Sequence, residues 1–278
     1  MIDGLMKIRL TDFPTSTNRC PICGGTPNQM SNWDMFKDIL PSELEYLLYG
    51  ICPLHLWIRV LEFILNLSYR LDVKQWRCNP NKIREAKARV QKAISEKLNL
   101  QVSVVKPGAG TTNNGNMGRK IINNYVITSE CTGINVNFLK RFNTLLTVIN
   151  SGFRLNTDAY NIYAKETMDL ITQEYSWMKL PPSVHSMLVH AGDVQDLLPF
   201  SLGESSEEGL ESSHKRKRYI REFHTRKNSR EHTIRDMFQK DLQETDPVLL
   251  DKSLKEQFKT KRESLTSEML KLIECEIL

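Results

Sequence analysis

The stretch LLYGICPLHLWIRVLEFILNLSY, residues 47–69, is the most apolar part of the chain and decides the fold class. It carries His55, Arg59 and Glu62, whose polar and charged side chains would be costly in lipid, so it predicts a buried helix rather than a membrane span. Proline removes a backbone hydrogen-bond donor and clashes with the preceding helical turn. Pro53 should therefore kink this helix or split it in two.

Helical patterns fill most of the remaining chain. After Asn81, apolar residues recur at helical spacing with Lys and Arg on the other side: Ile83, Ala86, Val90, Ile94 and Leu98. Further helices are predicted around residues 138–149 and from about Asp158, whereas the Gly- and Asn-rich segment 105–120 is predicted to be a loop. Residues 1–13, MIDGLMKIRLTDF, alternate like a strand and start abruptly, as in a domain entered partway through. The sequence thus predicts a mainly α fold with a short β remnant at its front.

The composition is that of an ordinary globular protein. The 278 residues are 40% hydrophobic and 26% charged, enough for one large or two modest domains. The formal net charge of +5 permits a nucleic-acid partner, and much of the excess falls between His214 and Arg230. Six cysteines are scattered along the chain, which predicts reduced thiols in an intracellular compartment: Cys20, Cys23, Cys52, Cys78, Cys131 and Cys275.

A metal site is indicated by CPIC, residues 20–23, which lies in a turn rich in Pro, Thr, Ser and Asn. Two thiolates at this spacing can both reach one Zn²⁺ ion at about 2.3 Å, so this segment is a candidate half-site. A redox pair is the alternative. Redox pairs usually lie at a helix N-terminus in a βαβ context, and this turn has no such context.

Two pairs of residues compete to complete a tetrahedral site. Cys52 and His55, in CPLH, are three apart and share a helix face, whereas His185 and His190, in VHSMLVH, are offset by about 140° on an ideal helix. Against the first pair, its segment is the most apolar in the chain, where both side chains are more often part of the core. The residues alone leave both pairs open.

The most basic segment is GLESSHKRKRYIREFHTRKNSR, residues 209–230. Such a density of cations attracts phosphates by releasing counterions. Tyr219 and Phe223 are four apart, so one side of a helix here is predicted to dock on the protein while the other faces outward. A solvated helix face or a nuclear-import signal is the alternative interpretation. The cations are Lys215, Arg216, Lys217, Arg218, Arg221, Arg226, Lys227 and Arg230.

One carboxylate, Glu211, lies just ahead of this basic segment. In two-metal phosphoryl transfer, acidic side chains hold divalent ions about 4 Å apart, and these ions clamp the attacking and leaving oxygens. An acid at the head of a basic helix is therefore a candidate metal ligand beside a bound DNA strand.

Taken together, these segments resemble the Transib-type DDE transposases and the related catalytic subunit of the V(D)J recombinase. The match lies in order as well as content and covers nearly all of this chain, but only the C-terminal half of the family's catalytic region. The matching segments are MIDG (1–4), CPIC (20–23), NGNMGRK (114–120), HSMLVH (185–190) and GLESSHK (209–215).

The resemblance implies specific roles for several residues. Cys20, Cys23, His185 and His190 would bind one structural Zn²⁺. Glu211 would be the third acid of the Asp-Asp-Glu active site and Asp3 the second, together binding Mg²⁺ or Mn²⁺. The eight cations of the basic segment would contact DNA.

The resemblance also implies a domain organisation. The chain would be the C-terminal part of an RNase H-like catalytic core that carries a large helical zinc-binding insertion. Residues 1–18 would form a partial strand region, 19–203 the insertion, 204–245 the catalytic and basic helical segment, and 246–278 the charged C-terminal helices.

Two departures from the family pattern shape the functional expectation. Leu210 stands where a family member has Asn, and Ser213 replaces a Gly. The second departure is that the first catalytic Asp should lie upstream of Met1, so we expect this chain by itself to cleave DNA poorly or not at all.

The leading hypothesis is a truncated or partial transposase whose complete form nicks DNA and then transfers strands. The family implies a nuclear protein that acts as a homodimer on DNA element ends, with no membrane association. The alternative hypothesis is a zinc-stapled helical module that binds DNA or a partner protein without catalysis.

Overall fold

The protein is mainly helical, as its sequence predicts. The computed structural model describes residues 10–11, 13, 18–36, 44–47, 51–105, 111–206, 208–244, 246–248, 251 and 264–274. Most of the strand expected in residues 1–13 therefore lies outside the described part, and its described residues, Leu10, Thr11 and Phe13, are not in a strand. Within that part, β structure is confined to two isolated antiparallel bridges, Val105 with Thr111 and Leu155 with Ile273. The chain forms two compact units: Met1–Ser206 with Ser267–Leu278, and Glu207–Thr266.

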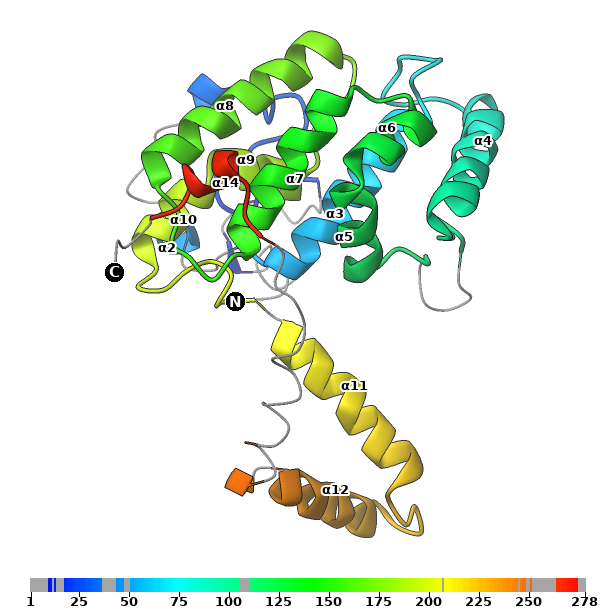
Figure 1. Cartoon of the computed structure of the whole chain (residues 1–278), viewed down its shortest axis with the longest axis vertical. Helices are drawn as coiled ribbons and strands as arrows, with labels where there is room; N and C mark the ends of the chain where they lie inside the picture. Colours follow the sequence, from blue (N-terminus) through cyan, green and yellow to red (C-terminus); the bar gives the residue numbers. More distant parts are fainter. Residues whose placement is uncertain are drawn as a thin grey trace. The chain divides into compact units, whose positions relative to one another are not determined.

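The first unit is built around helix α3 (Pro53–Ser68), preceded by the short 3-10 helix η1 (Trp33–Met35) and by α2 (Leu44–Leu47). Pro53 occupies the first turn of α3, where its missing N–H would be unpaired in any case, so it starts a new helix as the sequence predicts. Helix α3 packs against α4, α5, α7 and α9 (Figure 1). Its apolar side chains are therefore buried by protein on several sides.

Helix α4 (Pro80–Leu98) follows the predicted pattern. Ala86, Val90, Ile94 and Leu98 are buried, and the last three pack in one cluster with Leu61 and Leu65 of α3. The Asn79 side chain accepts a hydrogen bond from the Asn81 N–H at the start of the helix.

Helices α5 (Gly115–Asn123) and α6 (Tyr125–Thr132) come next, and α5 corrects the predicted loop. The Asn114 side chain caps α5 by accepting from the Met117 N–H at 3.0 Å. A Cβ on Gly118 would lie only 2.6 Å from the Trp57 carbonyl oxygen, so glycine is what allows α5 to lie against the α3 backbone. The glycines of this segment therefore serve helix packing as well as turn formation.

The remaining helices of this unit are α7 (Val136–Asn150), α8 (Thr157–Glu174), α9 (Pro182–Val189), α10 (Ala191–Leu197) and α14 (Ser267–Leu270). Helices α8, α9 and α10 contact one another, and α9 also contacts α3. The C-terminal segment returns to this unit: α14 packs on α7, and Lys140 forms an ion pair with Glu268 at 2.8 Å.

The second unit is a helical hairpin of α11 (Glu208–Phe223) and α12 (Arg230–Glu244). Arg226, in the connecting turn, binds the Asp236 carboxylate through its guanidinium and its backbone N–H. Ser229 caps α12 by accepting from the His232 N–H. Across the described ranges, no helix has both the length and the hydropathy needed to cross a membrane.

Candidate metal centre and basic helix

The two cysteines of CPIC lie on a tight turn. The Gly24 N–H donates to the Cys20 carbonyl and the Cys20 N–H donates to the Gly25 carbonyl, which closes the loop. Gly24 has φ +68°, a left-handed conformation that glycine adopts without strain. This turn presents the thiols of Cys20 and Cys23 toward the same point.

The two histidines come from the end of α9. His185 lies within the helix, whereas His190 is the first residue beyond it, with φ −111° and ψ −5°. His190 therefore departs from the ideal helical path, and the 140° offset expected from a continuous helix no longer separates the two rings. Their ring centroids are 5.0 Å apart.

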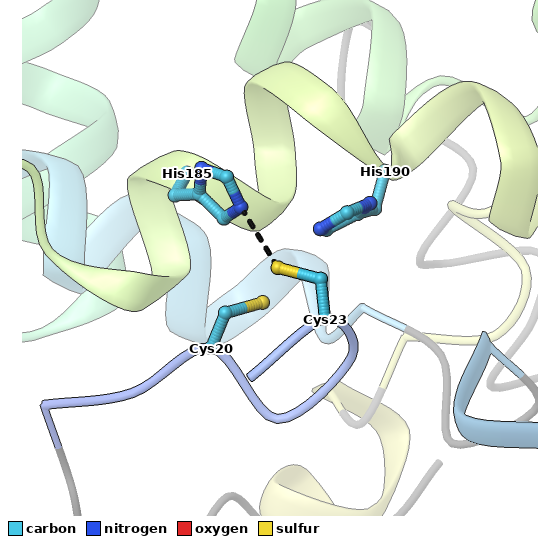
Figure 2. A group of neighbouring side chains, drawn as sticks. All are labelled: Cys20, Cys23, His185 and His190. Carbon is cyan, nitrogen blue, oxygen red and sulfur yellow. Dashed lines mark hydrogen bonds between the residues drawn. The ribbon is translucent and has the colours of Figure 1, made fainter. Parts of the chain in front are cut away.

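Four side chains from the cysteine turn and the end of α9 consequently converge (Figure 2). The ligand atoms of Cys20, Cys23, His185 and His190 all lie within 4.8 Å of one another. Cys20, His185 and His190 are fully buried. The group has the residue types and the spacing of a site that could hold one metal ion.

The hydrogen bonds of His185 define which nitrogen faces the cluster. Its Nδ1 donates to the Met30 carbonyl oxygen at 2.8 Å, and a carbonyl oxygen can only accept, so Nδ1 carries the proton. The lone pair of Nε2 then points toward the Cys23 sulfur, 3.3 Å away. A histidine that donates its second N–H to a carbonyl is the usual arrangement of a metal ligand.

His190 gives an independent test of whether a metal fits. Both its ring nitrogens are buried, and neither has a hydrogen-bond partner among the described residues. A buried polar group without a partner costs about 1–3 kcal/mol. A metal ion between the thiols and the imidazoles would satisfy one of these nitrogens.

The thiol of Cys20 is also suited to metal binding. Burial by itself raises its pKa, but the nearby Cys23 thiol and the imidazoles of His190 and His185 outweigh burial and hold the pKa well below its usual range. A lowered pKa favours the thiolate, which is the form that binds metals.

The competing pair does not join this group. Cys52 is buried at the N-cap of α3 and His55 lies one turn further along the helix. In the described part of the chain, the group of metal-binding residue types contains the CPIC thiols and the α9 histidines, without Cys52 or His55.

Three neighbours of the cluster were not found from the sequence. The Met30 carbonyl orients His185, the Ser186 hydroxyl lies 3.4 Å from the Cys20 sulfur, and the Phe36 ring packs edge-on against His185 with centroids 5.2 Å apart. Ser186 is adjacent to His185 in the sequence, but a serine carries no motif. The other two depend on the path of the chain between the cysteine turn and α2.

The basic segment forms α11 and the turn into α12. Its eight predicted cations are all exposed. The guanidinium of Arg226 is held by Asp236, at 2.7 Å. Tyr219 and Phe223 pack against each other with ring centroids 5.1 Å apart, yet they remain 56% and 64% exposed, so the predicted docking side of this helix is open to solvent.

The two predicted catalytic acids are placed only in part. The backbone of Glu211 belongs to the first turn of α11, but its side chain lies outside the described part. Asp3 also lies outside it. The pairing of these two carboxylates therefore stays a prediction.

No protein-family model matches this chain, and no curated protein matches it.

Proposed function

We propose that this chain is a zinc-stapled helical DNA-binding protein derived from a Transib-type DDE transposase. The observation that carries the proposal is the buried group of Cys20, Cys23, His185 and His190, because the resemblance selects the same four residues. The cysteine pair lies at least 162 residues before the histidine pair, so chance would rarely bring the two pairs together.

Zinc is the metal that best suits this set of donors. Two sulfur and two nitrogen ligands in a tetrahedral arrangement favour Zn²⁺. The distance of 3.3 Å between the Cys23 sulfur and His185 Nε2 is close to the roughly 3.5 Å that tetrahedral zinc bonds require. Four protein ligands leave no open position, so the ion is structural and pins the cysteine turn to the end of α9.

DNA is the partner that best suits the second unit. Lys215, Lys217, Arg218 and Arg221 are exposed along one helix, and no described residue forms a hydrogen bond or an ion pair with their charged side-chain groups. Their charge is available to phosphates, which such side chains bind by releasing counterions. By family resemblance, the protein acts in the nucleus and as a homodimer.

The test of DNA binding compares two double variants of equal charge change. In Lys215→Gln/Arg218→Gln, affinity for duplex DNA should fall about tenfold, and the slope of log affinity against log salt should become about 1.8 units shallower, since each phosphate contact contributes about 0.9. Lys82→Gln/Arg84→Gln, on the exposed side of α4, is the control and should bind as wild type. Equal losses in both variants would show that the attraction is general and does not come from α11.

A second candidate function is DNA cleavage, favoured by the position of Glu211 in the first turn of the basic helix. With Asp3, it would hold Mg²⁺ or Mn²⁺ beside a strand bound by α11. The chain, joined to the upstream strands of a Transib-type transposase, should nick supercoiled plasmid in Mn²⁺. Glu211→Gln should abolish nicking and leave affinity intact, whereas Glu222→Gln should leave both unchanged. Absence of nicking by the joined protein would leave the binding module as the function.

A further inference from the structure

A groove of about 1390 Å³ runs along the surface of the first unit, next to the metal cluster but separate from it. One wall is the cysteine turn, a second is α3, and a third is the segment that leads into α9. Small-molecule sites typically measure about 300–1,000 Å³. The groove is therefore large enough for an extended ligand.

One side of α3 supplies a polar stripe along this groove. His55, Arg59, Glu62 and Asn66 recur at spacings of three and four, and Arg70 continues the line just past the helix end. His55, Arg59, Glu62 and Asn66 lie within the most apolar segment of the sequence, residues 47–69. The opposite sides of α3 are buried in the core, so the stripe is the helix's outward face.

The charge of the lining is strongly positive. Its basic side chains are Arg19, Arg59, Arg70, Arg77 and Lys179, whereas Glu62 is its one carboxylate. Glu62 is paired with Arg59 at 2.8 Å. Arg77 and Lys179 form no hydrogen bond or ion pair with any described residue, so their charges are available to a ligand.

The composition of the lining favours phosphodiesters over carboxylates. Most of the cations are arginines, whose planar guanidinium matches two phosphate oxygens at once. Trp76, which is half-buried, lies in the same lining and offers a flat aromatic surface. Grooves that combine cations with an aromatic platform are typical of proteins that bind single strands, because every base can stack on such a ring.

We propose that this groove binds single-stranded nucleic acid, with backbone phosphates on Arg77 and Lys179 and a base on Trp76. The site is distinct from the basic helix α11, which belongs to the other unit and is assigned to duplex DNA. The proposal goes beyond the proposed function because it adds a second binding site for a different form of nucleic acid.

The experiment measures the fluorescence anisotropy of a labelled 12-nucleotide oligo-dT on the full-length chain. Arg77→Gln/Lys179→Gln should weaken binding about tenfold and make the salt slope about 1.4 units shallower, at about 0.7 per phosphate of a single strand. Trp76→Leu should weaken binding about tenfold without changing the salt slope, because stacking is uncharged. The control Lys82→Gln/Arg84→Gln removes the same charge away from the groove and should bind as wild type.

Three results would overturn the proposal. They are wild-type affinity in the groove variants, equal loss in the control, and tighter groove-dependent binding of duplex DNA or polyglutamate than of oligo-dT. Thermal melting of each variant shows that it is folded. The α11 variant Lys215→Gln/Arg218→Gln should lose duplex binding yet respond to the groove substitutions as wild type does. Failure of the groove proposal is thereby distinguished from failure of the proposed function.

Discussion

His190 is the residue whose buried ring nitrogens most clearly need a ligand. Both its nitrogens are buried without a hydrogen bond from the described part of the chain, beside two thiols and a second imidazole. Proteins pair nearly all such groups. A metal ion bound at this point would explain why the chain tolerates an otherwise costly arrangement.

Replacing His190 should therefore release the metal. We expect His190→Ala to lose at least nine-tenths of its zinc after dialysis, measured by elemental analysis against about one ion per wild-type chain. His55→Ala and Cys52→Ser should keep theirs, because these side chains lie outside the cluster. Zinc loss from Cys52→Ser with retention in His190→Ala would reassign the ligands.

The convergence of His185 and His190 could not be predicted from their spacing in the sequence. A five-residue offset separates two side chains on an ideal helix, which counted against His185 and His190. The helix ends at Val189, and the backbone of His190 turns away from the helical path. That ending depends on how α9 meets α10, which is a tertiary contact and has no local signature.

At the element scale, hydrophobic period and proline position were reliable guides. The buried positions of α4 are the predicted ones, and Pro53 starts α3. The segment 105–120 was predicted as a loop from its Gly and Asn content, but its second half is α5. Glycine normally weakens a helix, and here the close packing of α5 on α3 outweighs that preference.

This packing makes Gly118 sensitive to any side chain. Gly118→Ala should destabilise the first unit by about 1–3 kcal/mol, because the new Cβ meets backbone at Trp57, which cannot rotate away. Urea unfolding measures the loss. Gly152→Ala is the matched control, since no atom lies within 4 Å of its added Cβ, and it should unfold as wild type.

The α11–α12 hairpin should be sensitive to acid. The hydrogen bonds from Arg226 lower the pKa of Asp236 from 3.8 to about 2. A carboxyl group whose pKa is lowered by folding stabilises the fold above its unfolded pKa, so this contribution is present above about pH 4 and is lost as the pH falls to about 2.

The amide NMR signals of α11 and α12 report this transition. Asp236→Asn should show weakened protection from hydrogen exchange already at pH 7, and its hairpin should respond less than wild type to acid between pH 4 and 2. Asp241→Asn, on the same helix, should behave as wild type. Identical acid responses in wild type, Asp236→Asn and Asp241→Asn would show that the Arg226–Asp236 contact does not stabilise the hairpin.

At the scale of the whole molecule, the cluster of Cys20, Cys23, His185 and His190 brings the cysteine turn together with the end of α9. Its cysteines lie near residue 20 and its histidines near residue 190, so one bound ion would constrain a long stretch of chain. The mainly α fold was predictable from the sequence because helical period is a local property. The arrangement of the helices depends on contacts between residues that are distant in sequence. Only the Cys and His motifs indicated one such contact, between the cysteine turn and α9.

Removing the metal should therefore loosen the whole first unit. A ligand at about 1,000 times its Kd stabilises a protein by about 4 kcal/mol, which for this size corresponds to a fall in Tm of about 8–16 °C when a strong chelator is added. Differential scanning calorimetry measures it. His190→Ala should melt at the lower temperature with or without chelator. If the Tm of the zinc-loaded wild-type protein does not change when the chelator is added, zinc does not stabilise the first unit.

X-ray absorption at the zinc edge of the purified full-length chain tests the central claim most directly. We predict two sulfur neighbours at about 2.3 Å and two nitrogen neighbours at about 2.0–2.1 Å around one ion per chain. A shell of four sulfurs, a shell of oxygens alone, or the same spectrum after His185 and His190 are both replaced by Ala would contradict it.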